Sequence, residues 1–179
     1  MSHNFIEYFA YGSNMFDNVI VRNRNIQYSE ARPATLAGYA LRFTCPGVNK
    51  YEPSFANIEP EQGQSVEGVL YQLSNEQFEK MFKSEGGMYD IVDLNVLTND
   101  GLHVPAKTLV SVNRIQECSP SLRYLNLLVK GAKEKGLSGD YIQNLEATPH
   151  EPTPPMYSLV CFLVTGYLRV KFYLQQRSK

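Results

Sequence analysis

Cysteine and histidine are scarce in this chain, and neither residue forms a cluster. The three cysteines are far apart and make no C-x-x-C pair: Cys45, Cys118 and Cys161. Because an odd number of scattered cysteines does not build a disulfide framework, we expect a protein of a reducing compartment. The three histidines are also dispersed, without the i, i+4 spacing of a helical zinc site. We therefore expect no metal centre.

An excess of charge of either sign is also missing. The formal net charge is -1 at pH 7, so the composition predicts no nucleic-acid partner. At the N-terminus no basic segment precedes an apolar one, so we expect no secretory signal and a cytoplasmic protein. Hydrophobic residues make up 43% of the 179 residues. That share excludes wholesale disorder, and the length suits one domain with a buried core plus a tail.

Strand patterns dominate the first two-thirds of the chain. Runs of β-forming residues predict strands at residues 5–10, 34–43, 55–58, 66–73, 89–98 and 104–112. The polar residues 46–53 are expected to form a loop, and residues 60–63 a turn. The segment Asn99-Asp100-Gly101 predicts a hairpin between the last two strands.

Helical patterns fill the last third of the chain, after one short helix further upstream. Ser74 is expected to cap the upstream helix, and the glycines at 86–87 to end it. The pair Ser119-Pro120 is expected to begin a second helix that ends at Gly136, and Ser138 to cap a third. Strands followed by helices indicate the α+β class.

The composition changes abruptly after residue 148. Residues 149–155 contain four prolines, and we interpret them as an extended linker. The following residues, 156–179, are expected to form a separate tail. Its apolar run is interrupted by Arg169 and Lys171 before it reaches the roughly 20 residues that a spanning helix needs. Three interpretations stay open: membrane association through residues 156–174, docking on the preceding domain, or a disordered tail.

Residues 8–14, Tyr-Phe-Ala-Tyr-Gly-Ser-Asn, are the first segment that suggests chemistry. The expected strand stops at a turn in which Gly12 and Asn14 tolerate positive φ. Asn14 is expected to cap a short helix from Met15. Backbone N–H groups left unpaired at such a turn bind carboxylates and other anions. A strand followed by an ordinary turn has the same pattern, so both interpretations stay open.

Glu85 is the second candidate. It lies between the end of the expected helix and the pair Gly86-Gly87. The helix macrodipole disfavours a carboxylate at the C-terminal end of a helix. Glu85 is therefore either a solvated surface residue or a residue held there for a function.

Together these segments resemble the γ-glutamylcyclotransferase family. That family carries the same seven-residue signature near its N-terminus and a Glu-Gly pair between a short helix and a strand that begins with tyrosine. The similarity continues through Ser119-Pro120, Tyr124, the segment Gly-Ala-Lys-Glu-Lys-Gly-Leu at 131–137, and Tyr141. Met15 stands where the family usually has leucine, a difference that conserves volume. The resemblance implies a small mixed β-barrel with flanking helices, formed by residues 1–148.

The resemblance also implies an intramolecular reaction that uses no cofactor. The α-amine of a γ-glutamyl substrate attacks the γ-carbonyl of the same molecule, which yields 5-oxoproline and releases an amine. The implied general acid and base is Glu85. The implied substrate-binding residues are Tyr8, Phe9, Ala10, Tyr11, Gly12, Ser13 and Tyr141. Tyr124 is as readily a core aromatic as a site residue.

Several alternatives stay open within this interpretation. The substrate could be a γ-glutamyl-amino acid, glutathione, a γ-glutamyl-amine or a secondary metabolite, because rim loops that set the choice cannot be built from sequence. From a different class, the chain could be an inactive homologue that binds γ-glutamyl compounds or carboxylates, or a membrane-tethered adaptor. A homodimer is also open.

Overall fold

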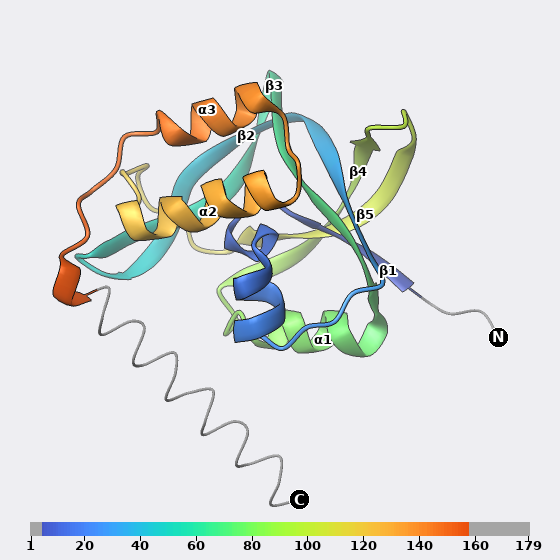
Figure 1. The fold of residues 1–179 in the computed structure, drawn as a ribbon, viewed down its shortest axis with the longest axis horizontal. Coiled ribbons are helices and arrows are strands. Elements are labelled where there is room, and N and C mark those ends of the chain that lie inside the picture. The colour runs from blue at the N-terminus through green and yellow to red at the C-terminus, as the bar shows by residue number, and fades with distance from the viewer. Residues whose placement is uncertain (1–4, 158–179) are drawn as a thin grey trace, which may run out of the picture.

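The protein, seen here as a computed structural model, is described over residues 5–157 (Figure 1). Its strands are β1 (Phe5–Ala10), β2 (Glu30–Asn49), β3 (Glu52–Ser74), β4 (Tyr89–Thr98) and β5 (His103–Ser111). Its α-helices are α1 (Asn75–Lys83), α2 (Leu122–Glu134) and α3 (Gly139–Glu146). Between β1 and β2 lie a 3-10 helix, η1 (Ser13–Met15), and a π-helical segment, η2 (Asn18–Asn23).

The five strands close into a barrel in the order β1-β3-β2-β4-β5. Neighbouring strands are antiparallel except at the closure, where β1 and β5 pair in parallel through Tyr8 and Lys107. Helices α2 and α3 lie side by side against one flank of the barrel, and α1 lies near the opposite end (Figure 1). The prediction of an α+β protein built on a small mixed barrel with flanking helices is confirmed.

The β2–β3 ribbon is longer than the sequence predicts. We expected a loop at residues 46–53, but β2 continues to Asn49 and β3 begins at Glu52. We also expected a turn at residues 60–63, but Ala37 pairs with Ser65 and Tyr39 with Pro60, so residues 61–64 form a bulge inside one strand. Both expectations were wrong because one face of an antiparallel ribbon lies in solvent and carries polar residues, like a loop.

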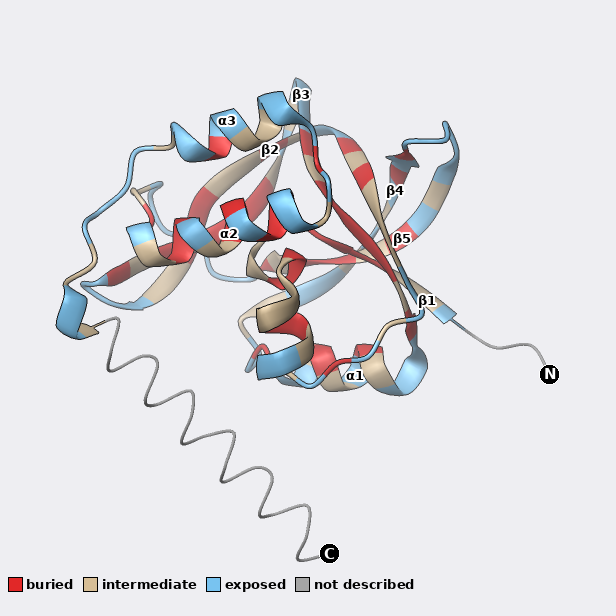
Figure 2. Ribbon diagram, in the orientation of Figure 1, coloured by how far each residue is buried: buried red, intermediate tan, exposed pale blue. Residues whose placement is uncertain are grey.

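A continuous hydrophobic core fills the barrel and extends beneath α2. Figure 2 shows buried residues concentrated in the strands and on part of the surface of α2. Fully buried strand residues include Phe9, Leu36, Ile58, Leu70 and Leu73. From α2, Leu125, Leu128 and Ala132 join the same core. Burial of the inner face of α2 fixes this helix against the segment that follows β1, where the site lies.

The sequence predicts the correct N-cap residue for two of the three described α-helices. Ser74 Oγ accepts the Gln77 N–H at 3.3 Å, and Ser138 Oγ accepts the Tyr141 N–H at 3.2 Å, as expected for N-caps. The second helix, however, begins after Ser121 and not at Ser119-Pro120. Ser121 is the true cap because residue 121 forms an isolated β-bridge with residue 151, which fixes the chain as extended up to that point.

The segment that we expected to be a linker is hydrogen-bonded to the barrel domain. The Glu151 N–H donates to Pro120 O, and the Leu122 N–H donates to Glu151 O, each at 2.8 Å. Further along, Asn49 Nδ2 donates to the Tyr157 hydroxyl at 2.8 Å. The expected tail falls almost wholly at residues 158–179, outside the described part of the chain. Between residues 5 and 157, no helix is long and apolar enough to cross a membrane.

Candidate active site

A cavity of about 240 Å³ opens where the segment after β1 meets the end of α1 and the start of α2. Its polar lining comes from four places far apart in sequence: the end of the chain segment formed by β1 and the turn after it, the residue that follows η2, the residues after α1, and the first turn of α2. Its walls include Phe55, Met88, Leu109 and Leu127, which are apolar. A largely apolar cavity with a few converging polar groups is the usual form of a small-molecule site.

Glu85 lies at the polar end of this cavity. It follows α1 in a turn whose next two residues, Gly86 and Gly87, have φ of +66° and +78°. These left-handed conformations reverse the chain at little cost only because the residues are glycines. Glu85 is 9% exposed, so the solvated-surface interpretation does not hold. Its carboxylate accepts a hydrogen bond from Asn14 Nδ2 at 3.0 Å and forms an ion pair with Arg24.

Asn14 connects the two halves of the polar end. Its Nδ2 donates both to Glu85 Oε1 and to the Tyr8 hydroxyl, each at 3.0 Å. Its Oδ1 is buried and has no hydrogen-bond partner among the described residues. We expected Asn14 to cap a helix from Met15, which was wrong. The 3-10 helix η1 begins at Ser13 with Gly12 as its N-cap, so the side chain of Asn14 is available to the cavity.

Gly12 lies in close contact with Tyr124. Its φ is -108°, so the turn does not use the positive φ that glycine tolerates. Instead, a Cβ at Gly12 would approach the Tyr124 hydroxyl to 3.3 Å. That hydroxyl accepts the Ala56 N–H at 3.1 Å and a second hydrogen bond from the Ser13 backbone. A side chain at residue 12 would therefore push the Tyr124 hydroxyl away by a few tenths of an ångström and disturb the close packing of the turn against α2.

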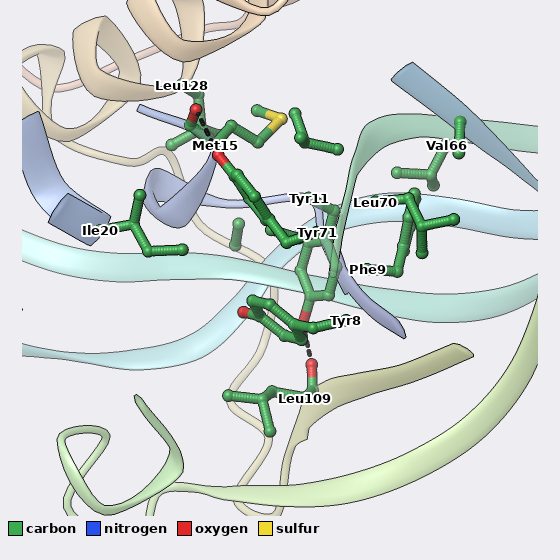
Figure 3. Close-up of a cluster of buried hydrophobic side chains, with 14 of the residues drawn as sticks. Tyr8, Phe9, Tyr11, Met15, Ile20, Val66, Leu70, Tyr71, Leu109 and Leu128 are labelled. Atoms are coloured by element: carbon green, nitrogen blue, oxygen red, sulfur yellow. Dashed lines mark hydrogen bonds between the residues drawn. The ribbon is translucent and has the colours of Figure 1, made fainter. Parts of the chain in front are cut away.

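Buried groups hold the turn from behind. The Tyr71 hydroxyl lies 3.0 Å from Met15 O and 3.1 Å from Asn14 O, and it shares its proton between them. Figure 3 shows Tyr71 reaching Met15 and, beside it, the Tyr11 hydroxyl donating to Leu109 O. Gly131 of α2 lies so close to η1 that a Cβ would be 2.7 Å from the Phe16 nitrogen. The backbone that carries Asn14 is thus fixed on two sides.

The tyrosines of the cavity are neutral at physiological pH. Burial raises the pKa of Tyr8 well above its usual range, and the nearby Glu85 carboxylate raises it further. Burial likewise raises the pKa values of Tyr11 and Tyr124. Tyr8 accepts a hydrogen bond from Asn14, and no acceptor for its own proton is found within residues 5–157. Tyr8 therefore presents a neutral O–H donor to the cavity.

The structure brings together most, but not all, of the residues implied by the resemblance. Glu85, Tyr8, Tyr11, Gly12 and Ser13 line one cavity. Phe9 and Ala10 do not line it, because they are buried in the barrel core.

Tyr141 also lies outside this cavity. Its hydroxyl, on α3, is buried without a partner in the described part of the chain. Burial raises its pKa, with a smaller contribution from Glu67. Tyr124, which we left undecided, is the helix tyrosine that reaches the cavity.

Two arginines of the lining had no sequence signal. Arg24 lies in a polar run, Arg-Asn-Arg-Asn, that resembles an ordinary solvated segment. Arg123 lies at the first turn of α2, and its Nε donates to Glu52, a carboxylate that is 1% exposed. Neither pairing can be foreseen without the tertiary structure, since the partners are 61 and 71 residues apart.

Comparison with known proteins agrees with this geometry. Residues 65–145 match the model of the AIG2-like family. The chain is 30% identical to the γ-glutamyl cyclotransferase gliK of Aspergillus fumigatus, over 88% of this chain and 68% of that protein. It is 30% identical to the γ-glutamylcyclotransferase of Bos taurus, over 78% of this chain and 77% of that protein.

Solved structures show the same fold. One titled γ-glutamyl cyclotransferase superposes with a TM-score of 0.73 at 22% identity, and the match covers 88% of this chain and 98% of that one. A fold shared at this identity says nothing by itself about chemistry. Taken with the sequence relatives, however, it defines the class: the chain belongs to the γ-glutamylcyclotransferase family.

Proposed function

We propose that this protein is a γ-glutamylcyclotransferase in which Glu85 is the general acid and base. It converts a γ-glutamyl compound into 5-oxoproline and a free amine. The observation that carries the assignment of Glu85 is its place: a carboxylate, 9% exposed, at the polar end of the cavity that the signature turn lines. A general base must lie within hydrogen-bond reach of the proton that it removes.

The polar end of the cavity matches the charged end of a γ-glutamyl substrate. The α-ammonium group fits between Glu85 and the unpartnered Oδ1 of Asn14, which offers an acceptor and no proton. The turn at Gly12, which lines the same cavity, is the proposed contact for the α-carboxylate, since the Ser13 backbone is already hydrogen-bonded to Tyr124. Holding both groups at one end folds the substrate chain back toward its own amine.

Protons balance in the proposed reaction without water. Glu85 removes a proton from the α-ammonium group, and the resulting amine attacks the γ-carbonyl carbon, which forms the new C–N bond of the lactam. Glu85 then gives its proton to the departing nitrogen as the original C–N bond breaks, and it passes the second proton of the attacking nitrogen to the released amine in the same way. In total, two protons leave the attacking nitrogen and two arrive at the leaving nitrogen, so the same carboxylate works first as base and then as acid.

Tyr8 is the proposed donor for the oxygen that becomes negative during the attack. Its hydroxyl lies in the cavity, its own proton has no acceptor in residues 5–157, and its raised pKa keeps it protonated. Donors placed in advance of charge development contribute much of the rate enhancement in acyl transfer. Phe55 and Leu127 belong to the apolar lining of the cavity, which is the proposed place for the departing amine.

The test is substitution of Glu85 combined with detection of 5-oxoproline. γ-Glutamyl-L-alanine and glutathione serve as substrates, and E79Q is the matched control because Glu79 is an exposed residue of α1. We expect E85Q to lower kcat by about 10² or more, with product binding retained in calorimetry. Wild-type turnover in E85Q would place the base elsewhere. Binding of product by a wild-type protein that forms no 5-oxoproline would favour the inactive-homologue alternative.

Membrane contact through residues 156–174 and a homodimer stay predictions. The division into a domain at 1–148, a linker and a tail is likewise a proposal. Co-sedimentation with anionic liposomes, compared between the full chain and one ending at Tyr157, tests the membrane contact. Light scattering of the full chain tests the dimer.

A further inference from the structure

We propose that Arg24 is a positioning residue for the reaction, because its guanidinium holds both oxygens of the Glu85 carboxylate and keeps that group ready to accept a proton. This inference rests on the proposed function of Glu85. It adds a residue that the seven-residue signature and the Glu-Gly pair do not include. Arg24 does not need to touch the substrate, since it acts through the carboxylate.

The guanidinium of Arg24 contacts both oxygens of the Glu85 carboxylate, and both side chains are largely shielded from solvent. Arg24 Nη2 lies 2.9 Å from Glu85 Oε1 and 3.0 Å from Oε2, while Nη1 donates to Ser84 Oγ. The side chain of Arg24 is 19% exposed and that of Glu85 is 10% exposed. A planar guanidinium in such a position restricts rotation of the carboxylate far more than a solvated surface pair does.

The fold holds the backbone of Arg24 in place. The Arg24 N–H donates to Val19 O at 3.0 Å and ends η2. Asn25, the following residue, has φ of +54°, and its carbonyl accepts a hydrogen bond from Lys80 Nζ of α1 at 2.6 Å. Ile26 then returns the chain to the core, where it is fully buried. The turn is therefore fixed to both η2 and α1. These contacts hold the backbone of Arg24 where its side chain reaches the residues at the end of α1.

Among the described residues, Arg24 is the cation that forms an ion pair with Glu85. The other titratable groups facing this carboxylate are the phenols of Tyr8 from β1, Tyr11 after it and Tyr124 from α2, which are neutral because burial raises their pKa values. The nearest lysines, at the last turn of α1, have other partners: Lys80 binds the Asn25 carbonyl, and an exposed Lys83 lies 4.0 Å from Glu79.

This arrangement has a consequence for both halves of the proton transfer. The permanent positive charge of Arg24 stabilises the negative charge of the Glu85 carboxylate, which is the form that accepts a proton. After Glu85 has taken the proton, the same charge favours its return, this time to the departing nitrogen. Asn14 Nδ2 binds the carboxylate too, but without a net charge it cannot make this contribution.

The experiment compares pH profiles of kcat/KM for R24M, R24K and a control, with γ-glutamyl-L-alanine as substrate. Arg22 supplies the control: R22M removes the same charge from an exposed residue of η2. We expect R24M to move the acid limb of the profile to higher pH, because loss of the neighbouring positive charge disfavours the carboxylate form that acts as base. R24K should leave the limb in place while lowering kcat/KM, since lysine lacks the second nitrogen that donates to Ser84 Oγ and fixes the orientation of the cation. R22M should match the wild type.

Each outcome decides one question. If E85Q abolishes turnover while the acid limb of R24M coincides with that of the wild type, the role of Arg24 is refuted and the proposed function stands. If E85Q retains turnover, the proposed function fails first. A lower melting temperature for R24M with an unmoved limb would show a structural contact only. Should R24M not fold, R24Q repeats the measurement, because its amide keeps one hydrogen bond to the carboxylate without the charge.

Discussion

Replacing Gly131 by alanine should damage catalysis more than folding. Gly131 is a helix residue of α2, and a Cβ there would lie 2.7 Å from the Phe16 nitrogen, 2.8 Å from Met15 Cβ and 2.9 Å from Met15 C. Two of these three atoms belong to the backbone, so no side-chain rotation can relieve the overlap. Non-bonded heavy atoms prefer separations of about 3.5–4.0 Å. The turn of η1 must therefore move away from α2 by roughly 0.6–1.3 Å.

The effect on stability is the difference between two opposing contributions. Overpacking of a tight contact costs about 1–3 kcal/mol. Alanine in place of glycine inside a helix recovers about 0.8–1.0 kcal/mol. The expected net loss is about 0–2 kcal/mol, which corresponds to a fall in melting temperature of about 8 °C at most for a chain of this size. The G131A protein is therefore expected to fold.

The effect on activity is larger because η1 carries Asn14. The movement displaces the amide that joins Tyr8 to Glu85, with contacts of 3.0 Å to each. A misplacement of about 1 Å in a catalytic arrangement can cost about 10²-fold. We expect kcat/KM for γ-glutamyl-L-alanine to fall by about ten- to a hundredfold.

Gly139 provides the control for this substitution. It lies at the start of α3, and a Cβ there would meet no atom within 4 Å. G139A should keep wild-type activity and melt at the same temperature or slightly higher. A G131A enzyme with wild-type kcat/KM would refute the view that close packing of α2 positions the turn.

Three further predictions concern the donor, alkaline pH and the C-terminal segment. Y8F should lower kcat by about 10² with little change in melting temperature, as expected for loss of an oxyanion donor; unchanged kcat would remove Tyr8 from the mechanism. Since burial raises the pKa values of Tyr8 and Tyr124 in the folded state, the unfolded chain loses those protons first, near pH 10, so stability should be full below about pH 10 and fall above it; a melting temperature that stays constant to about pH 11 would contradict this. A chain ending at Glu151 should melt lower than one ending at Tyr157, because it loses the hydrogen bonds from the Arg123 N–H to Thr153 and from Asn49 to Tyr157; equal melting curves would show that residues 152–157 add nothing.

Part of this fold could be predicted from local sequence patterns. The hairpin of β4 and β5 was predictable because Asn99-Asp100-Gly101 suits a tight turn, and Gly101 has φ of +83°. Ser74 and Ser138 were predictable as caps because each precedes an amphipathic run. The start of α2 was not, since Ser119 and Ser121 are both good caps. A bridge to a residue 30 positions later, Glu151, decides between them.

The site was predictable only where its residues are consecutive. The turn and Glu85 were identified through the family signature. Asn14 was part of that signature, but its role was misjudged because the same residue type also caps helices. Arg24 could not be identified, because its contact with Glu85 exists only after η2 and the end of α1 pack together. Tyr124 and Tyr141 have equivalent sequence contexts, and only the packing of α2 against η1 separates them.

The buried oxygen of Asn14 has a consequence for discrimination between substrate and product. Both amide protons of Asn14 are already donated, so only the carbonyl oxygen remains, and it can recognise nothing but a hydrogen-bond donor. A substrate nitrogen arrives with three protons and a positive charge, whereas the lactam nitrogen of the product has one proton and no charge. On the proposed function, ring closure therefore weakens the contacts that the substrate nitrogen would make with Asn14 and Glu85. The product should therefore bind more weakly than the substrate. Compounds whose α-amine is acylated should bind weakly for the same reason.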